Sequence, residues 1–401
     1  MAVATHARYC PVCGGDSTER FCAADGTATV LRLTVDPASV AYEPGHVIEG
    51  RYRITGKIGR GGFGAVFSAI HTGTGQEIAI KVLIVDLSED NGSIIRRFWQ
   101  EAQITAQLRH PNTVRVFDVG QTEEGAFYIA MERLRGTTLG DLLQDRAAQG
   151  EVLVEDEALD IAIAVLRSLG EAHRAGLVHR DLKPANVMLC ESPDEDAPIV
   201  KVLDFGIART QDSSLTRQGA SLGTPAYMSP EQCRGEIVDP RSDIYALGTI
   251  LYRCVCGRPP YFDENPLSVM FQHTSAPIPE VRRLARTPLS DGFVTCVQKA
   301  LSKQASDRFG DAREMREALE TVRTGVWTAQ SLGRGAEGRT QLAWSGTPGT
   351  SAPAEAPHPI ADARFGGETD GYDSSVVVAR AESAVTAAAA AVTIAPAHPR
   401  S

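Results

Sequence analysis

A glycine-rich segment between two strand-like segments is the feature that most constrains the fold. Residues Gly59–Val66 fit the pattern G-x-G-x-x-G-x-V, and alternating apolar side chains flank them over Tyr52–Ile58 and Ala65–Ile70. A phosphate loop of the dinucleotide-binding type would open a helix, whereas here a second strand follows. The pattern therefore predicts glycines at the bend of a β-hairpin, where backbone amides can approach phosphate oxygens. An ordinary glycine-rich turn is the alternative interpretation.

The chain divides into three regions of different composition. Residues 1–45 contain a cysteine cluster, and residues 49–323 alternate strand-like and helix-like patterns. The last 78 residues, 324–401, contain 48 Ala, Gly, Pro, Ser or Thr, so they cannot bury enough apolar surface to offset chain entropy. We therefore expect a short N-terminal segment with its linker, one central domain and a disordered tail.

Strand signals come early in the central region and helix signals come late. A third strand is expected over Glu77–Ile84, and an apolar stripe from Ile94 to Leu108 at steps of three and four predicts a helix. From Glu155 onward, helical periodicity dominates. This order favours an α+β domain with a small sheet-rich lobe and a larger, mainly helical lobe.

Composition excludes several classes of function. The 401 residues include 40 basic and 50 acidic side chains, a net charge of −10, which argues against a general nucleic-acid binder. An apolar stretch long enough to cross a membrane is lacking, as is an apolar N-terminal signal segment, and the 8 cysteines are too few for a disulfide scaffold. We expect a cytoplasmic protein that binds neither nucleic acid nor membranes.

Several polar and charged side chains that could take part in catalysis follow the hairpin. Lys81 ends the run Ile78–Lys81 on the third strand, and Glu101 on the following helix is the candidate carboxylate to hold it, although each could equally be an ordinary surface residue. Asp181 could accept a hydroxyl proton, while Asn186 and Asp204 supply oxygen ligands of the kind that Mg²⁺ prefers. Phosphoryl transfer needs little else.

Six motifs in this order resemble the signature set of protein kinases, and the match is similar to the bacterial Hanks-type serine/threonine kinases. They are Gly59–Val66, Ile78–Lys81, Glu101, His179–Asn186, Asp204–Gly206 and Ser229–Glu231. The resemblance spans most of the central region and implies a bilobal protein-kinase fold, with a small antiparallel-sheet lobe plus one helix and a larger helical lobe.

The resemblance implies a role for each matching residue. Lys81 would contact the ATP phosphates and pair with Glu101, Asp181 would accept the substrate proton, and Lys183 would steady the transferred phosphoryl group. Asn186 and Asp204 would hold magnesium. Met131 would be the gatekeeper of the adenine pocket. The implied nucleotide-binding positions are Ile58, Gly59, Arg60, Gly61, Gly62, Phe63, Gly64, Val66, Ala79, Lys81, Met131, Glu132 and Leu134.

The same resemblance implies substrate class and regulation. The loop Asp181-Leu182-Lys183-Pro184 is similar to that of kinases that modify serine or threonine in proteins, and Gly223-Thr224-Pro225 supports this class. Arg180 stands where it could pair with a phosphate on the following segment. We expect autophosphorylation at Thr216 first and at Ser221 second; a Ser/Thr-rich loop suited to solvent is the alternative.

Three further residues resemble structural supports of the family. Glu231 and Arg308 are expected to form a buried ion pair, and Asp243 is expected to support the catalytic loop. Two other functions stay open: a pseudokinase scaffold, disfavoured because Lys81, Asp181, Asn186 and Asp204 are all present, and a small-molecule phosphotransferase, disfavoured by the complete segment from Asp204 to Glu231.

The N-terminal cysteines resemble a zinc ribbon. Cys10-Pro11-Val12-Cys13 is followed by glycines, and the second half reads Cys22-Ala23-Ala24-Asp25, with a carboxylate in place of the last thiolate. Cys10, Cys13, Cys22 and Asp25 could hold structural Zn²⁺, with His6 or His46 as alternative fourth ligands. Three reduced cysteines in a leader segment are the other interpretation. Such a module would serve to contact a protein partner.

Overall fold

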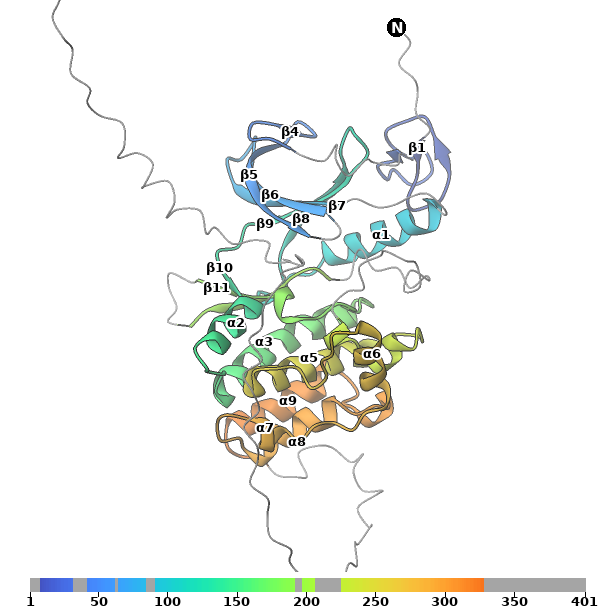
Figure 1. Ribbon diagram of the computed structural model, residues 1–401. Coiled ribbons are helices and arrows are strands. Elements are labelled where there is room, and N and C mark those ends of the chain that lie inside the picture. The colour runs from blue at the N-terminus through green and yellow to red at the C-terminus, as the bar shows by residue number, and fades with distance from the viewer. Residues whose placement is uncertain are drawn as a thin grey trace, which may run out of the picture.

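A computed structural model describes residues 8–31, 42–61, 64–83, 91–191, 197–205 and 225–327. These residues form two lobes of unlike class, a sheet-rich lobe above and a helical lobe below (Figure 1). The predicted α+β, two-lobed architecture is confirmed. Within the described residues, no helix combines the length and apolar character needed to cross a membrane.

The small lobe is built on an antiparallel sheet of six strands in the order β4-β5-β6-β7-β9-β8. One helix, α1 (Asn91–Thr105), covers the sheet. Both confirm the prediction of strands followed by a helix, although Leu108 lies beyond the helix end and is buried in the large-lobe core. The strands are β4 (Val47–Ile48), β5 (Tyr52–Gly61), β6 (Gly64–His71), β7 (Glu77–Leu83), β8 (Val116–Gln121) and β9 (Phe127–Glu132).

The glycine-rich segment extends both strands of the predicted hairpin. Strand β5 continues to Gly61 and β6 begins at Gly64, so the strands reach further into the glycines than the alternation alone predicts. Gly64 has a φ of 150°, and a Cβ atom there would lie 1.9 Å from the carbonyl oxygen of Val82 on β7. Only glycine therefore fits at the first residue of β6, where that strand pairs with the end of β7.

The large lobe is mainly helical. Its longest helix, α3, has Glu155, Asp156 and Glu157 in the first turn and His173 and Arg174 in the last, which suits the helix dipole. The helices are α2 (Leu139–Ala148), α3 (Glu155–Arg174), α4 (Pro230–Cys233), α5 (Pro240–Cys256), α6 (Pro266–Ser275), α7 (Val281–Leu284), α8 (Asp291–Ala300) and α9 (Ala312–Arg323), with short 3-10 turns at Pro184–Asn186, Pro225–Tyr227 and Ala305–Asp307.

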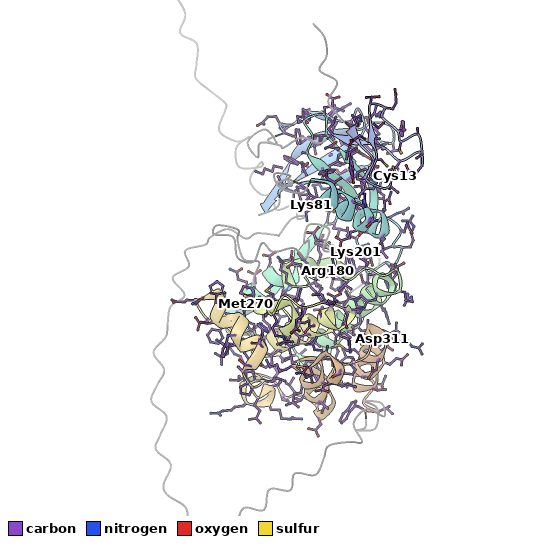
Figure 2. The ribbon with its side chains drawn as sticks, turned by 90° about the vertical axis from the view of Figure 1, so that its right-hand side faces the viewer. Cys13, Lys81, Arg180, Lys201, Met270 and Asp311 are labelled. Atoms are coloured by element: carbon purple, nitrogen blue, oxygen red, sulfur yellow. The ribbon has the colours of Figure 1, made fainter. Side chains whose placement is uncertain are left out.

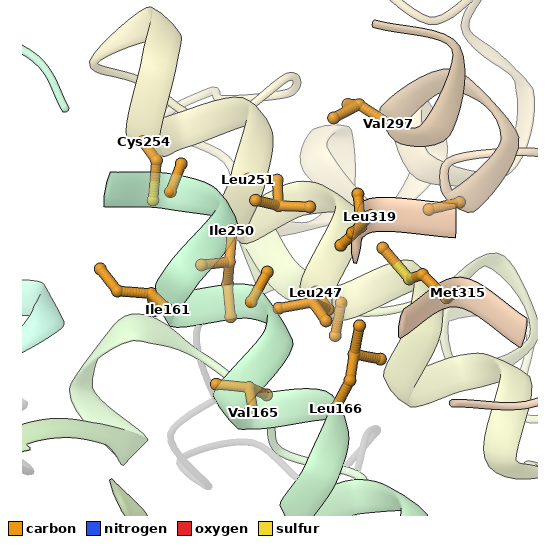
Figure 3. Close-up of a cluster of buried hydrophobic side chains, with 14 of the residues drawn as sticks. Ile161, Val165, Leu166, Leu247, Ile250, Leu251, Cys254, Val297, Met315 and Leu319 are labelled. Atoms are coloured by element: carbon orange, nitrogen blue, oxygen red, sulfur yellow. The ribbon is translucent and has the colours of Figure 1, made fainter. Parts of the chain in front are cut away.

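The core of the large lobe lies between α3, α5, α8 and α9 (Figure 3). Helix α5 is buried nearly all round, and it begins at the N-cap Asp239 and ends at Gly257, whose φ of 76° suits a left-handed cap. Side chains of α3 and α5 interdigitate with those of α9. This packing gives a rigid base for the loops at the upper end of the lobe.

Two small sheets were not predicted. Strands β10 (Gly136–Thr138), β11 (Val187–Cys190) and β12 (Ile199–Val202) form an antiparallel sheet at the top of the large lobe. Strands β1 (Arg8–Tyr9), β2 (Asp16–Ser17) and β3 (Val30–Leu31) form another in the N-terminal segment, which has little hydrophobic periodicity. Strands of two to four residues are too short for alternation to show them.

The predicted ion pair between Glu231 and Arg308 is confirmed. Both Arg308 terminal nitrogens donate to the Glu231 carboxylate, at 2.7 and 2.8 Å, and Ser242 also donates to it. Burial alone would raise the pKa of Glu231, but the bonds from Arg308 and Ser242 outweigh burial and lower it to about 2. The pair joins α4 to the chain before α9.

Replacing Glu231 by glutamine would leave the Arg308 charge buried without a compensating carboxylate. We expect E231Q to lower the free energy of unfolding by about 3–5 kcal/mol, measured by urea denaturation near neutral pH. The matched control is E236Q, because Glu236 forms an exposed pair with Arg234 and its loss should leave the free energy of unfolding nearly unchanged.

The lowered pKa of Glu231 also predicts how the stability of the protein changes with pH. The unfolded chain binds the Glu231 proton near pH 4.5, and the folded protein only near pH 2, so this contribution is present above pH 4.5 and lost as the pH falls toward 2. E231Q should lack that part of the acid dependence. Equal acid destabilisation of both proteins over this range would contradict the assignment.

Candidate functional site

The sequence-predicted catalytic residues gather where the two lobes meet. Lys81 lies on β7 and Glu101 on α1, both in the small lobe. Asp181 lies in the loop after α3, and Asp204 follows β12, both in the large lobe. Figure 2 shows Lys81 and Arg180 at the facing sides of the two lobes. Residues far apart in sequence are thus brought to one place.

A buried carboxylate holds the loop that carries Asp181. Asp243 on α5 is 1% exposed and accepts hydrogen bonds from the backbone N–H groups of His179 and Arg180, at 2.8 and 2.9 Å. His173 Nε2 lies 2.8 Å from the same carboxylate. Arg180 has a φ of 62°, a conformation that costs energy for a residue with a side chain. The predicted support by Asp243 is confirmed.

His179 connects this loop to the segment that carries Asp204. Its ring is fully buried, Nε2 donates to the carbonyl of Leu203 over 2.9 Å, and Nδ1 accepts from the backbone N–H of Asp181 over 3.3 Å. This pattern fits a neutral ring protonated on Nε2. One side chain therefore fixes the spacing between Asp181 and the residue before Asp204.

The side chains around Asp181 form a short network. Asn186 donates from Nδ2 to the carbonyl oxygen of Asp181 over 2.8 Å, and Lys183 Nζ lies 3.2 Å from the Asp181 carboxylate. The backbone carbonyl of Asn186 accepts from Leu203 over 2.9 Å. Because the Asn186 amide nitrogen is used in this way, its oxygen is the atom suited to a cation. A pocket beside Asp181 is lined by Lys183, Tyr227 and Gln232, among others.

The ionic partners of Lys81 and Glu101 differ from the prediction. Lys81 Nζ lies 2.7 Å from Asp204 Oδ1, and Glu101 Oε1 lies 2.8 Å from Arg180 Nη1. The expected pair of Lys81 with Glu101 is thus replaced by two pairs that each cross between the lobes. The sequence alone does not predict which ion pairs form, because the position of α1 relative to the sheet determines which cation Glu101 reaches.

Asp204 is suited to a divalent cation. Its φ is 50°, and burial would raise the pKa of its carboxyl, but the nearby Lys81 outweighs burial and lowers it. The carboxylate is therefore ionised and faces the lobe junction beside a cation. Together with the Asn186 oxygen it offers the few hard oxygen ligands that Mg²⁺ takes alongside phosphate oxygens.

The apolar positions predicted to bind adenine lie in one hydrophobic cluster of the small lobe. Ala79 and Met131 pair directly in the sheet register, and Leu134 follows β9. The cluster contains Ile58, Val66, Ala79, Met131 and Leu134, joined by Met188 and Leu203 from the large lobe. Glu132 instead turns to Lys201 Nζ, at 2.7 Å, so its side chain has a structural partner.

Several predicted positions cannot be placed. Gly59, Arg60, Gly61 and Gly64 lie in β5 and β6, whereas Gly62 and Phe63 fall outside the described residues. The same holds for Gly206 and Thr224, and for both predicted phosphorylation sites, Thr216 and Ser221.

The N-terminal cysteine cluster comes together as predicted. One ligand atom from each of Cys10, Cys13, Cys22 and Asp25 lies within 4.8 Å of the others. Cys13 Sγ is 3.6 Å from Cys22 Sγ, too far for a disulfide, and Cys10 Sγ is 3.4 Å from Asp25 Oδ2. Of the alternative ligands, His46 stacks on Tyr42 instead, and His6 lies outside the described residues.

The cluster has an internal repeat. Cys10 N–H donates to the Gly15 carbonyl and Gly14 N–H to the Cys10 carbonyl; Cys22 and Gly26 make the same two bonds in the second half, with Thr27 in place of Gly15. Gly14 and Gly26 have φ values of 80° and 71°. By this repeat, Asp25 occupies the position that corresponds to Cys13.

Backbone amides favour the charged forms of two ligands. The N–H of Gly15 points at Cys13 Sγ over 3.4 Å and lowers the pKa of that thiol. The N–H of Thr27 donates to Asp25 over 2.9 Å and lowers the pKa of that carboxyl to about 2. Thiolate and carboxylate are the forms that bind metal.

Three residues of the site were missed by sequence reasoning. His173 contacts Asp243, Gln232 donates from Nε2 to the Arg180 carbonyl over 2.7 Å, and Met188 joins the apolar cluster. Met188 follows Asn186 closely and could have been found as part of an apolar run. The contacts of His173 and Gln232 span long sequence separations and leave no local signal.

The chain belongs to the protein kinase family, since the family model "Protein kinase domain" matches residues 52–321. Among curated proteins, it is 39% identical over 284 residues to "Serine/threonine-protein kinase pkn3" of Myxococcus xanthus, covering 69% of this chain and 51% of that protein. It is 38% identical to "Serine/threonine-protein kinase PknB" of Mycobacterium tuberculosis, covering 70% of this chain and 44% of that protein.

Solved structures agree with the family assignment. The crystal structure of the Mycobacterium tuberculosis PknI kinase domain matches with a TM-score of 0.56 and 32% identity, covering 70% of this chain and 99% of that one. The chain spans about half the length, or less, of the curated relatives it matches, 51% of the Myxococcus protein and 44% of PknB. The resemblance to Hanks-type bacterial kinases is confirmed.

Proposed function

We propose that the protein is an ATP- and Mg²⁺-dependent serine/threonine protein kinase. The convergence of Asp181, Asn186, Asp204 and Lys81 at the lobe junction carries the proposal, because these side chains supply a base, metal ligands and a phosphate-binding cation. Bound magnesium would be held by Asn186 and Asp204 and would neutralise phosphate charge. The domain limits proposed are 1–45 for the metal-binding segment and linker, 49–323 for the kinase domain and 324–401 for the tail.

The roles of the chain's own residues follow from their contacts. Asp181 would accept the proton of the acceptor hydroxyl, and Lys183, already 3.2 Å from that carboxylate, would neutralise charge on the transferred group. Lys81 would orient the α- and β-phosphates.

Phosphotransfer to a generic protein substrate tests the proposal. With Mg²⁺ and ATP, wild type should produce phosphoserine or phosphothreonine, and D181N should lower kcat by about a hundredfold or more, because an amide cannot accept the proton. D145N, at an exposed position of α2, is the matched control and should keep its activity. Equal labelling by wild type and D181N would contradict the catalytic assignment, and phosphorylation of small molecules alone would favour the small-molecule phosphotransferase.

We also propose activation by autophosphorylation of the segment after Asp204. Arg180 is already paired with Glu101, so a phosphate on Thr216 or Ser221 would compete for that guanidinium. A dianionic phosphate is the stronger partner. Binding of this phosphate to Arg180 would release Glu101. Glu101 would then compete with Asp204 for the Lys81 ammonium group.

Preincubation with Mg²⁺ and ATP tests this regulation. Wild type should gain activity as phosphate accumulates on Thr216 and Ser221, because the phosphate binds Arg180 and so displaces Glu101 from it. Phosphopeptide mapping measures the accumulation of phosphate. The variant T216A/S221A should show no gain. Active wild-type protein with the segment between Asp204 and Glu231 unmodified would contradict the mechanism.

We propose structural Zn²⁺ at Cys10, Cys13, Cys22 and Asp25. Tetrahedral zinc places two sulfur ligands about 3.8 Å apart and a sulfur and an oxygen about 3.5 Å apart, by its usual bond lengths. The corresponding distances are 3.6 Å for Cys13–Cys22 and 3.4 Å for Cys10–Asp25. These two distances are close to those in a tetrahedral zinc site, which supports the proposal.

Elemental analysis of protein purified under reducing conditions tests the zinc site. Wild type should contain about one zinc per chain, and C13S/C22S should lose it, because two ligands are too few for a structural site. D25C should retain zinc, since it completes a four-thiolate set, and C233S in the large lobe is the control that should not change it. Metal-free wild-type protein would contradict the site.

A further inference from the structure

The N-terminal module, residues 8–31, is packed against helix α1. Tyr9 and Val30 are only 3% and 1% exposed. Both belong to the hydrophobic cluster that contains Ile95 and Trp99 of α1 and Val116 of β8. Figure 1 shows the module beside α1, away from the lobe junction. The small lobe therefore buries part of its core under this module.

Polar contacts fix the module to both α1 and the sheet. Arg96 on α1 donates to the Tyr9 hydroxyl over 3.3 Å. At the end of β8, the Gln121 amide makes two bonds with the backbone of Leu31, accepting its N–H over 2.6 Å and donating to its carbonyl over 2.9 Å. A module bound to both elements restricts the movement of α1 relative to the sheet.

That movement determines which partner Glu101 has. Glu101 lies on α1, about 7.5 Å along the helix axis from Arg96, whereas Lys81 lies on β7 within the sheet. A shift or rotation of α1 over the sheet is needed to bring Glu101 from Arg180 to Lys81. In the structure with the module docked, Glu101 bonds Arg180.

The docking residues are coupled directly to the metal ligands. Tyr9 precedes Cys10, and Tyr9 pairs with Val30 in the β1–β3 ladder. The module has strands of only two residues each, so it has little core of its own, and metal binding would supply most of its folding free energy. Loss of metal should therefore disturb the surface that contacts α1.

We propose that the metal-loaded module is an intramolecular brace that holds α1 in the position where Glu101 bonds Arg180, and so restrains phosphotransfer. Release of the module, by loss of metal or of its contacts, frees Glu101 to pair with Lys81. The inference rests on the proposed kinase function and zinc site. It adds that metal occupancy in the N-terminal segment sets the activity of the kinase domain.

The test compares variants of the 401-residue chain that all carry T216A/S221A, so that no phosphate at these positions competes for Arg180 during the assay; the otherwise wild-type protein of this background is the reference. R96A/Q121A removes the polar contacts that fix the module but keeps its apolar contacts and all four metal ligands, and C13S/C22S removes the metal. The control is Q100A, an exposed position of the same helix. Zinc content and kcat/KM for a peptide substrate with Mg²⁺ and ATP are measured on each.

R96A/Q121A should keep its zinc and raise kcat/KM about fivefold or more, the range of ordinary allosteric coupling. C13S/C22S should lose zinc and gain activity in the same direction, and Q100A should match wild type. In an E101Q background the gain should disappear, which a merely structural role of the contacts would not explain.

Each failure has its own signature. Wild-type protein without phosphotransfer overturns the proposed function and the brace with it, and active, zinc-free wild type overturns the metal-dependent part. Active, zinc-loaded wild type with R96A/Q121A equal to it or less active overturns the brace alone. A gain that persists in the E101Q background also overturns it, because the effect would not pass through Glu101.

Hydrogen exchange of α1 separates release of the module from unfolding of the domain. The proposal requires faster exchange in α1 with unchanged protection of α5.

Discussion

The buried carboxylate of Asp243 is the constraint on which the active site depends. It accepts hydrogen bonds from two successive backbone amides, His179 and Arg180, and holds Arg180 in a left-handed conformation. A charged group buried in this way is stable only when its hydrogen bonds are satisfied, and here backbone amides and His173 provide them. The location of Asp181 is therefore determined by the core helix α5 rather than by its own loop.

A second level of organisation lies in the charges that cross between the lobes. Two anions, Glu101 and Asp204, face two cations, Lys81 and Arg180, and the pairing found here is one of two that conserve charge. Exchange between the pairings would leave no charge without a counterion, so it does not require burial of an unpaired charge. Contacts far from the junction, such as those on α1, can then decide between them.

The sequence allowed the fold and most of the site to be predicted, because these depend on local patterns. The glycines of the hairpin, the apolar stripe of α1 and the motif around Asp181 are all short-range signals. The pairing of Glu101 with Arg180 was not predicted, because it depends on how far α1 lies from the sheet. The docking of Tyr9 and Val30 on α1 was also missed, since two apolar residues in a segment without periodicity give no indication of where they are buried.

Gly64 determines how genetic data on the glycine-rich hairpin should be interpreted. Gly59 pairs with Val66 directly after a register shift in the β5–β6 ladder, whereas any side chain at Gly64 would collide with the backbone of β7, the strand that carries Lys81. A substitution at Gly64 would separate two strands before any nucleotide is present. Inactivity of such a mutant would thus report a defect of sheet assembly and would not be informative about contact with phosphate.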